Sequence, residues 1–375
     1  MEIKSIESFV LTNTLDESFF FSQWEYATRQ ICLVKVTASD GTVGWGEGYG
    51  PATVVKSGVD FLGQFIKGMN PLETDAVWSV MYRRTLDYAR RGILVSAISA
   101  IDVALWDVKG KILGQPVHRL LGGKKRETIH PYATGMYYSR CPNLAQKLAD
   151  EARTYAQAGY TAMKMKVGLT PEADVRNVQA VREAIGSDIR LMIDANHAYN
   201  LTEATALCQQ LEPLDIAWFE EPVSPEHYGQ YAELRTRTSI PIAGGECEYM
   251  RYGFQQLFAG KCVDIAQPDI CSTGGLTEAR KIADLAMIYG VDVVPHTWGT
   301  NIAISAAINL AATLDKVPGR MYMPEQMIEL DRTENALRDE VTKLNYIVDK
   351  GVITITDEPG LGVEVDEELI KKYVL

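Results

Sequence analysis

The chain has 375 residues, and this length predicts two domains or one large barrel with an addition. With 46% hydrophobic and 23% charged residues, its composition is that of an ordinary soluble protein. Its net charge of -12 and pI near 5.0 exclude the basic surface that a nucleic-acid or anionic-membrane partner requires. No apolar run reaches about 18 residues, no signal peptide is visible, and the six cysteines form no CxxC pair, so we expect a reduced, cytoplasmic protein.

The first third of the chain predicts a small α+β domain. Three runs alternate like antiparallel strands and two further runs have helical period: 3–12, 30–39, 43–50, 73–86 and 92–113. Asp40-Gly41 is a hairpin signal between the second and third strands. The sequence LGGKK at 121–125 breaks this pattern. We therefore predict a capping domain over residues 1–125 and a catalytic domain over residues 126–349.

Beyond the boundary, short apolar runs alternate with helical stretches. The runs are 129–135, 161–168, 189–196, 216–222, 240–246, 263–269, 291–298 and, less clearly, 320–330. Alternating strands and helices imply a parallel sheet, and about eight units in roughly 200 to 250 residues predict a (β/α)₈-type barrel. A doubly wound sheet is the alternative, but no GxGxxG or GxxxxGK[ST] follows a strand. Residues 350–375 leave this rhythm, and we expect them to return to the capping domain.

Six successive predicted strands deliver a chemically active side chain near the carboxyl end. These are Lys164 and Lys166 on the second strand, then Asp194, Glu220, Glu246, Asp269 and His296. Each of them alone would be interpreted as a helix cap or a surface residue. Because active sites of such barrels lie at the carboxyl ends of the strands, the set together predicts one site.

Asp194, Glu220 and Glu246 are spaced by 26 residues each (220 − 194 and 246 − 220), which places three carboxylates at one height in the barrel. Three convergent carboxylates need a counter-charge, and oxygen ligands favour Mg²⁺ over Mn²⁺ or Ca²⁺. Zinc is less favoured because no His or Cys cluster is expected beside the carboxylates. We interpret His197 as a surface or loop residue and Cys247 as a small packing residue.

Lys164 and Lys166 lie on one face of their strand, and His296, with Asp269 on the neighbouring strand, lies across the barrel. Bases on two sides of a metal suit abstraction of a proton α to a carboxylate. The base must be neutral, and the adjacent ammonium and the metal are expected to lower the pKa of Lys166 towards neutrality. The same intermediate permits racemisation, dehydration or ring opening.

The motifs KMK, MIDAN, WFEEPV, AGGE, QPD and PHTW resemble, in this order, the mandelate racemase subgroup of the enolase superfamily, over nearly the whole chain. The resemblance implies Mg²⁺ at the three carboxylates, Lys166 and His296 as the two acid-base groups, Lys164 on the substrate carboxylate and Asp269 paired with His296. It also implies a substrate contact from the eighth strand, for which Glu329 is our match and Glu325 the rival. Asn196 and Trp298 are further predicted substrate contacts.

Within the subgroup the motifs are most similar to acid-sugar dehydratases and aldarolactone cycloisomerases. The resemblance thus implies proton abstraction followed by β-elimination on an acid sugar or its lactone, a small-molecule carboxylate. A racemase or epimerase of a 2-hydroxy acid, a magnesium-dependent aldolase and a non-catalytic binding barrel stay open as alternatives. The resemblance also implies a symmetric homo-oligomer, and specificity from two loops of the cap near residues 16–26 and 46–52.

Overall fold

The computed structural model describes residues 1–315, 321, 325–344, 348–349 and 351–375. The N-terminal part forms a three-stranded antiparallel sheet with three helices beside it: β1 (Ile3–Phe21), β2 (Trp24–Ala38), β3 (Val43–Gly48), α1 (Ala52–Ile66), α2 (Thr74–Thr85) and α3 (Ile93–Leu113). Helix α1 was not predicted from the sequence. It buries Val55, Val59, Leu62 and Ile66, whose spacing defines one helical face.

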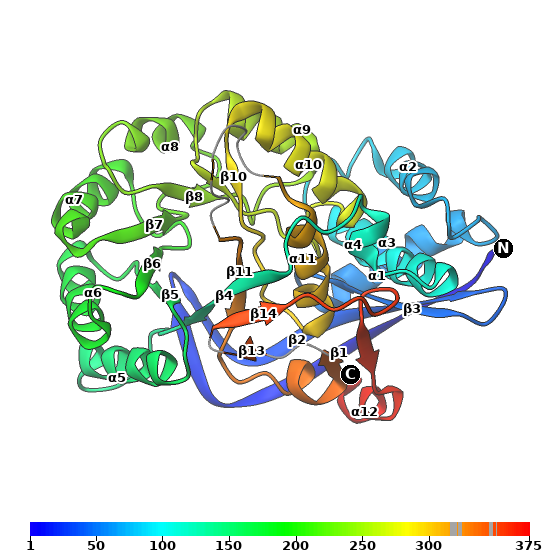
Figure 1. The fold of residues 1–375 in the computed structure, drawn as a ribbon, viewed down its shortest axis with the longest axis horizontal. Helices are drawn as coiled ribbons and strands as arrows, with labels where there is room; N and C mark the ends of the chain where they lie inside the picture. Colours follow the sequence, from blue (N-terminus) through cyan, green and yellow to red (C-terminus); the bar gives the residue numbers. More distant parts are fainter. Residues whose placement is uncertain (316–320, 322–324, 345–347, 350) are drawn as a thin grey trace.

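The segment predicted as a loop near residues 16–26 is instead the tip of the β1–β2 hairpin. After a shift in register between Thr14 and Phe19, its strands stay paired as far as Phe21 and Trp24. The tip also pairs with the barrel, because the backbone amides of Phe20 and Tyr138 each donate to the other's carbonyl, at 2.8 and 2.9 Å. Figure 1 shows this long blue hairpin reaching from the cap towards strands β4 and β5. The hairpin is thereby held against one end of the barrel.

Small residues on β3 allow the cap to pack tightly. A Cβ atom at Gly46 would lie only 2.0 Å from the carbonyl oxygen of Ala100 on α3, and one at Gly44 would lie 2.4 Å from that of Ala104. The sheet therefore rests directly on the backbone of α3. Gly44 and Gly46 face the same side because strand residues alternate.

The central part is a parallel barrel, which confirms the predicted fold class. Its strands are β4 (Thr128–Gly135), β5 (Ala162–Lys166), β6 (Arg190–Asp194), β7 (Ile216–Glu220), β8 (Ile242–Gly244), β9 (Ile265–Ala266), β10 (Asp292–Val293) and β11 (Met327–Asp331). Neighbours pair in parallel from β4 to β10, and β11 pairs in parallel with β4, so the last strand returns to the first. The beginning of the predicted eighth run, at residues 320 and 322–324, lies outside the described residues.

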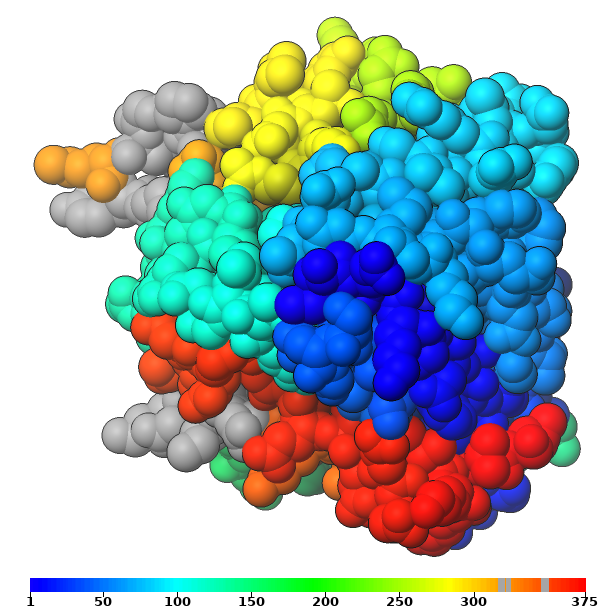
Figure 2. Space-filling view, turned by 90° about the vertical axis from the view of Figure 1, so that its right-hand side faces the viewer, coloured from blue at the N-terminus to red at the C-terminus, as the bar shows by residue number. Residues whose placement is uncertain are grey.

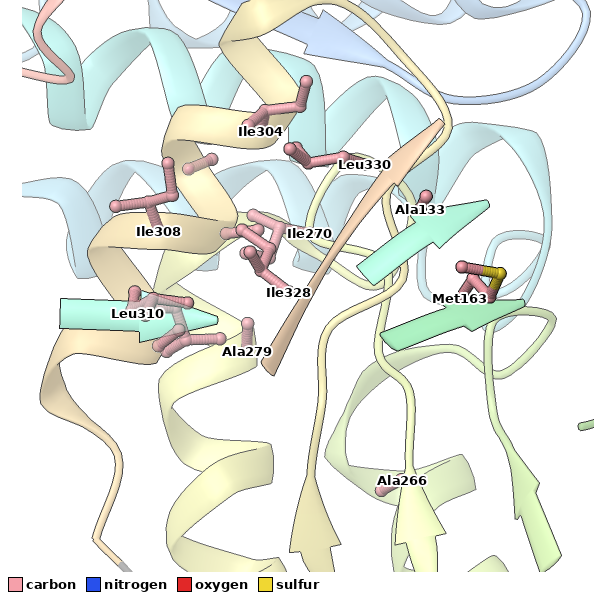
Figure 3. Packing of buried hydrophobic residues seen from close by; sticks show 14 of the residues in the cluster. Ala133, Met163, Ala266, Ile270, Ala279, Ile304, Ile308, Leu310, Ile328 and Leu330 are labelled. Carbon is pink, nitrogen blue, oxygen red and sulfur yellow. The ribbon is translucent and has the colours of Figure 1, made fainter. Parts of the chain in front are cut away.

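Helices follow these strands and cover the barrel: α5 (Leu144–Gln157), α6 (Pro171–Ile185), α7 (Leu201–Leu211), α8 (Tyr228–Arg235), α9 (Met250–Ala259), α10 (Gly275–Tyr289) and α11 (Asn301–Thr313). The main hydrophobic cluster fills the space between strands and helices. Figure 3 shows Ile304 and Ile308 of α11 close to Ile328 and Leu330 of β11. No helix of the described chain has the length and apolar character needed to cross a bilayer.

The C-terminal segment differs in part from its prediction. Its start, residue 350, lies outside the described residues. Strand β14 (Val352–Thr354) pairs with β4 of the barrel, where Ile353 is fully buried, so this portion does not return to the cap. The later part reaches the cap. The Leu361 amide donates to Asp107 Oδ1 of α3 at 2.8 Å. Helix α12 (Glu367–Tyr373) is followed by Leu375, whose amide donates to the Val10 carbonyl of β1 at 2.9 Å. Figure 2 shows the red C-terminal end beside the blue N-terminal strands.

The remaining elements are short. They are α4 (Val117–Leu120), the 3₁₀ helix η1 (Glu212–Leu214), the π-helical turn η2 (Leu337–Val341), β12 (Thr342–Leu344), β13 (Val348–Asp349) and β15 (Val363–Val365). Strand β12 pairs with β15, and β13 pairs with β14. The carboxyl ends of the barrel strands, and with them the predicted site, open towards the cap hairpin.

Candidate active site

Three carboxylates meet at the ends of adjacent barrel strands. Asp194 ends β6, Glu220 ends β7, and Glu246 follows β8 by two residues. One oxygen atom from each lies within 4.8 Å of those from the other two, and all three side chains are buried. The equal spacing in the sequence thus corresponds to one cluster in space.

The cluster fits a hard divalent cation by its donor set and its charge. Burial raises the pKa of Glu220 to about 7 despite the Lys164 ammonium, and burial together with Glu221 raises the pKa of Glu246 to about 7. Burial also disfavours ionised Asp194, but Lys166 and Lys164 outweigh it and lower the pKa to about 2. The lysines therefore balance only part of the negative charge, and buried carboxylate oxygens are ligands that Mg²⁺ prefers.

Glu220 is held by groups that the sequence pattern did not reveal. The side-chain amide of Gln267 donates to Glu220 Oε2 at 2.5 Å, and Trp218 Nε1 donates to the same oxygen at 3.0 Å. Lys164 contacts the other oxygen, Oε1. Gln267 stands two residues before Asp269 in the QPD motif, and the sequence pattern predicts a role for Asp269 alone. Such supporting hydrogen bonds fix a ligand's orientation.

The two lysines of β5 enter this cluster from one side. Lys164 is fully buried, with Nζ 2.9 Å from Glu329 Oε1 and 3.7 Å from Asp194 Oδ2. Lys166 Nζ donates to Asp194 Oδ2 at 2.5 Å and to Asn196 Oδ1 at 2.8 Å. Asn196, a predicted substrate contact, therefore lies against Lys166 and holds its ammonium in place.

The expected fall in the pKa of Lys166, which presumed a cation beside the two ammonium groups, is not produced by the protein groups alone. Burial does favour the neutral amine, and Lys164 lowers the pKa further, but the Asp194 carboxylate outweighs both and the pKa lies above its ordinary value. The reason is distance, because Asp194 accepts a hydrogen bond from Lys166. The sequence indicated the repulsion between neighbouring ammonium groups but not this closer attraction.

His296 faces the carboxylates from the other side, after β10. Its Nδ1 donates to Asp269 Oδ2 at 2.6 Å, and its Nε2 lies 3.2 Å from Glu246 Oε2. Burial disfavours the imidazolium, but Glu246 and the hydrogen bond to Asp269 outweigh it and raise the pKa to about 10. Asp269 thus orients the ring, and Nε2 is the nitrogen presented to the cluster.

The structure separates the two candidates of the eighth strand. Glu329 lies in the middle of β11, is buried, and accepts hydrogen bonds from Thr134 Oγ1 at 2.5 Å and from the Thr297 amide at 3.2 Å. Glu325 lies before the strand, is exposed, and pairs with Arg190 at 3.0 Å. Glu329 is therefore the residue that joins the cluster.

Aromatic side chains from cap and barrel enclose this region: Phe19, Phe21, Tyr26, Tyr49, Tyr137 and Trp298. Trp298, the remaining predicted contact, packs edge to face with Tyr26 at a centroid distance of 5.0 Å, and Arg29 lies 4.0 Å above it. Lys166 Nζ is 5.0 Å from the Phe21 ring centroid. The buried Trp298 Nε1 has no hydrogen-bond partner among the described residues.

A second group was missed because its members were interpreted singly. His197, Glu221 and Cys247 come together, with one candidate ligand atom from each within 4.8 Å of the others. Cys247 is exposed rather than packed, which corrects its predicted role. Each of the three closely follows one of the clustered carboxylates Asp194, Glu220 and Glu246 in the sequence. This shared position could have indicated that the three residues lie together.

Comparisons with known proteins find matches over nearly the whole chain. Residues 147–369 match the family described as Enolase C-terminal domain-like, and residues 7–122 match the mandelate racemase/muconate lactonizing enzyme N-terminal domain. The chain is 41% identical over 373 residues to a D-galactarolactone cycloisomerase of Agrobacterium fabrum, covering 100% of this chain and 99% of the relative. It is 34% identical to an arabinonate dehydratase of Saccharolobus solfataricus, covering 92% and 90%.

Solved structures show the same likeness. A 3,6-anhydro-D-galactonate cycloisomerase from Zobellia galactanivorans superimposes with a TM-score of 0.92, at 53% identity, over 100% of both chains. A racemase from Streptomyces coelicolor with bound magnesium superimposes with a TM-score of 0.90, at 26% identity, again over 100% of both chains.

Proposed function

Because the chain belongs to the mandelate racemase/muconate lactonizing enzyme family of the enolase superfamily, we propose that it is a magnesium-dependent cycloisomerase that opens the ring of an acid sugar by β-elimination. The observation that carries this choice is the 53% identity, over both whole chains, to a cycloisomerase of an anhydro-sugar acid. The relative at 41% identity is also a cycloisomerase, whereas the dehydratases among the relatives reach 34%.

The proposed substrate combines four features. They are a carboxylate, a hydrogen and a hydroxyl group on the α carbon, and a ring oxygen on the β carbon. Mg²⁺ held by Asp194, Glu220 and Glu246 would neutralise the charge that develops on the substrate carboxylate during proton loss. Lys164, which lies between Glu220 and Glu329, would donate to the same carboxylate.

Lys166 and His296 are the proposed proton-transfer groups. Mg²⁺ on Asp194 would offset the carboxylate that raises the pKa of Lys166. As a neutral amine, Lys166 removes the α proton, and the electron pair of that bond moves onto the substrate carboxylate. The pair then forms a carbon–carbon double bond as the bond from the β carbon to the ring oxygen breaks. His296, held by Asp269 with Nε2 towards the site, gives its proton to the departing oxygen. The resulting enol becomes a 2-keto acid when its β carbon takes up a proton. The Asp269 carboxylate, 2.6 Å from Nδ1, stabilises the imidazolium form that supplies this proton.

Product mass in D₂O tests this proposal. A cycloisomerase converts an anhydro-sugar acid or an aldarolactone into an open 2-keto acid of unchanged formula, with one carbon-bound deuterium. Loss of one water from an open-chain aldonate would instead identify a dehydratase. This second candidate is supported by an arabinonate dehydratase that is 34% identical over 92% of this chain. Deuterium at the α carbon of recovered substrate without either product would indicate a racemase and would overturn both readings. Mass spectrometry distinguishes the three outcomes.

Trp298→Phe is expected to lower kcat/KM for a cyclic substrate by about 10-fold, because a hydrogen bond in a buried site contributes about 0.5–1.5 kcal/mol. The buried Nε1–H has no partner among the described residues, so we propose that it donates to a substrate oxygen. Phenylalanine preserves most of the aromatic packing. Steady-state kinetics with the cyclic substrate measures the effect.

Trp24→Phe is the matched control. Trp24 lies at the start of β2 in the same hairpin, but its side chain is 54% exposed. Its replacement is expected to leave kcat/KM unchanged. Equal kinetics for wild type and Trp298→Phe would show that Trp298 only packs.

A further inference from the structure

The group formed by His197, Glu221 and Cys247, called here the rim cluster, lies apart from the reaction just described. His197 follows β6, Glu221 directly follows β7, and Cys247 follows β8. They thus come from the same three strands as Asp194, Glu220 and Glu246 but are different side chains, and the proposed reaction uses none of them. Cys247 is exposed, so the rim cluster is open to solvent.

The contacts in the rim cluster converge on one nitrogen. His197 Nε2 lies 2.9 Å from Glu221 Oε2 and 3.5 Å from Cys247 Sγ. A catalytic relay from thiol through imidazole to carboxylate would use both ring nitrogens, but Nδ1 has no hydrogen-bond partner among the described residues. The three atoms instead surround a common point, as ligands of a cation do.

Glu221 is the second observation that points to a ligand. Its side chain is 1% exposed, and Oε2 forms an ion pair with His197 Nε2 at 2.9 Å without the geometry of a good hydrogen bond. A buried carboxylate needs a counter-charge, which the imidazolium or a bound cation supplies. The backbone holds it there, because Glu221 and His197 both have left-handed φ angles, of 43° and 69°, and the His197 amide donates to the Glu221 carbonyl at 2.8 Å.

We propose that the rim cluster binds a divalent cation of the zinc class, through His197 Nε2, a Glu221 oxygen and Cys247 Sγ. One nitrogen, one oxygen and one sulfur are the donors that Zn²⁺ and Co²⁺ accept and that Mg²⁺ does not prefer. Bonds of about 2.0–2.3 Å in a tetrahedron place ligand atoms roughly 3.3–3.8 Å apart. The separation of 3.5 Å between Sγ and Nε2 lies in this range, and the separation of 2.9 Å between Nε2 and Oε2 would have to widen slightly. Binding releases the thiol proton of Cys247.

The site is separate in chemistry from the carboxylate cluster, which offers only oxygen atoms. It is nevertheless connected to it. His197 directly follows Asn196, whose side chain accepts a hydrogen bond from Lys166 at 2.8 Å. A cation in the rim cluster would therefore hold the loop that positions Lys166.

Cobalt titration tests this proposal without reference to activity. With the chain saturated in Mg²⁺, Co²⁺ is expected to produce a thiolate-to-cobalt charge-transfer band at one equivalent per chain. Cys247→Ser should abolish the band, and His197→Gln should weaken Co²⁺ binding by at least about 10-fold. The magnesium site has no thiol, so Co²⁺ bound there gives no such band.

Cys141→Ser is the matched control, because Cys141 is the other cysteine with solvent access. This variant should keep the full band and affinity. A band that is absent in the wild type, that persists in Cys247→Ser, or that keeps its affinity in His197→Gln would overturn the site. Circular dichroism of each variant verifies the fold.

Discussion

Lys166→Met is expected to lower kcat for ring opening by about 10³-fold, within the roughly 10²–10⁴-fold that a positioned acid or base contributes. Methionine keeps the length of the side chain but removes the amine that donates to Asp194 and Asn196. Exchange of the substrate's α hydrogen in D₂O should disappear together with turnover. Rapid kinetics and mass spectrometry measure both quantities.

His296→Asn distinguishes the two proton-transfer roles. It should depress ring opening as strongly as Lys166→Met but leave α-hydrogen exchange detectable, because Lys166 remains. The opposite pattern, exchange retained in Lys166→Met and lost in His296→Asn, would reverse the assignment. Near wild-type rates in both variants would refute the two-residue site. Lys56→Met is the control, since Lys56 lies on α1 in an exposed pair with Asp60 at 2.7 Å.

Glu220→Gln is expected to raise the Mg²⁺ concentration needed for half-maximal activity by at least about 100-fold. Loss of a residue that only supports a metal ligand lowers metal affinity by about 10- to 100-fold, and Glu220 is itself a proposed ligand. The change removes one of three negative charges from the cluster and replaces the ion pair between Lys164 and Glu220 with at most a neutral hydrogen bond. Magnesium titration of activity and calorimetric binding of Mg²⁺ measure the effect.

Glu278→Gln is a control matched in burial and pairing. Glu278 is fully buried on α10 and forms an ion pair with Arg251 at 2.6 Å, outside the site. This variant should lose stability but keep the wild-type magnesium dependence. An unchanged magnesium dependence in Glu220→Gln would show that Glu220 does not hold the cation.

The sequence alone determined the barrel and the members of its carboxylate cluster. A charged residue inside an apolar strand indicates a function because burying a charge is costly. Asp194, Glu220 and Glu246 also recur at one spacing in the sequence. The two-residue spacing of Lys164 and Lys166 placed both on one face of β5 before any contact was known. These inferences use only local periodicity, which the chain carries in its order of residues.

Contacts between strands were decided by the tertiary structure. The pairing of Glu329 with Tyr132 across β11 and β4 sets which glutamate reaches Lys164, and no local pattern distinguishes Glu329 from Glu325. The raised pKa of Lys166 and the hydrogen bond from Gln267 to Glu220 likewise depend on neighbours across the sheet.

The rim cluster could not be predicted from the sequence for the same reason. His197, Glu221 and Cys247 are unremarkable one at a time, and only the parallel register of β6, β7 and β8 brings them within reach of one another. Electrostatic and hydrogen-bond energies depend on atomic distances, and between strands those distances follow from register and packing, not from separation along the chain.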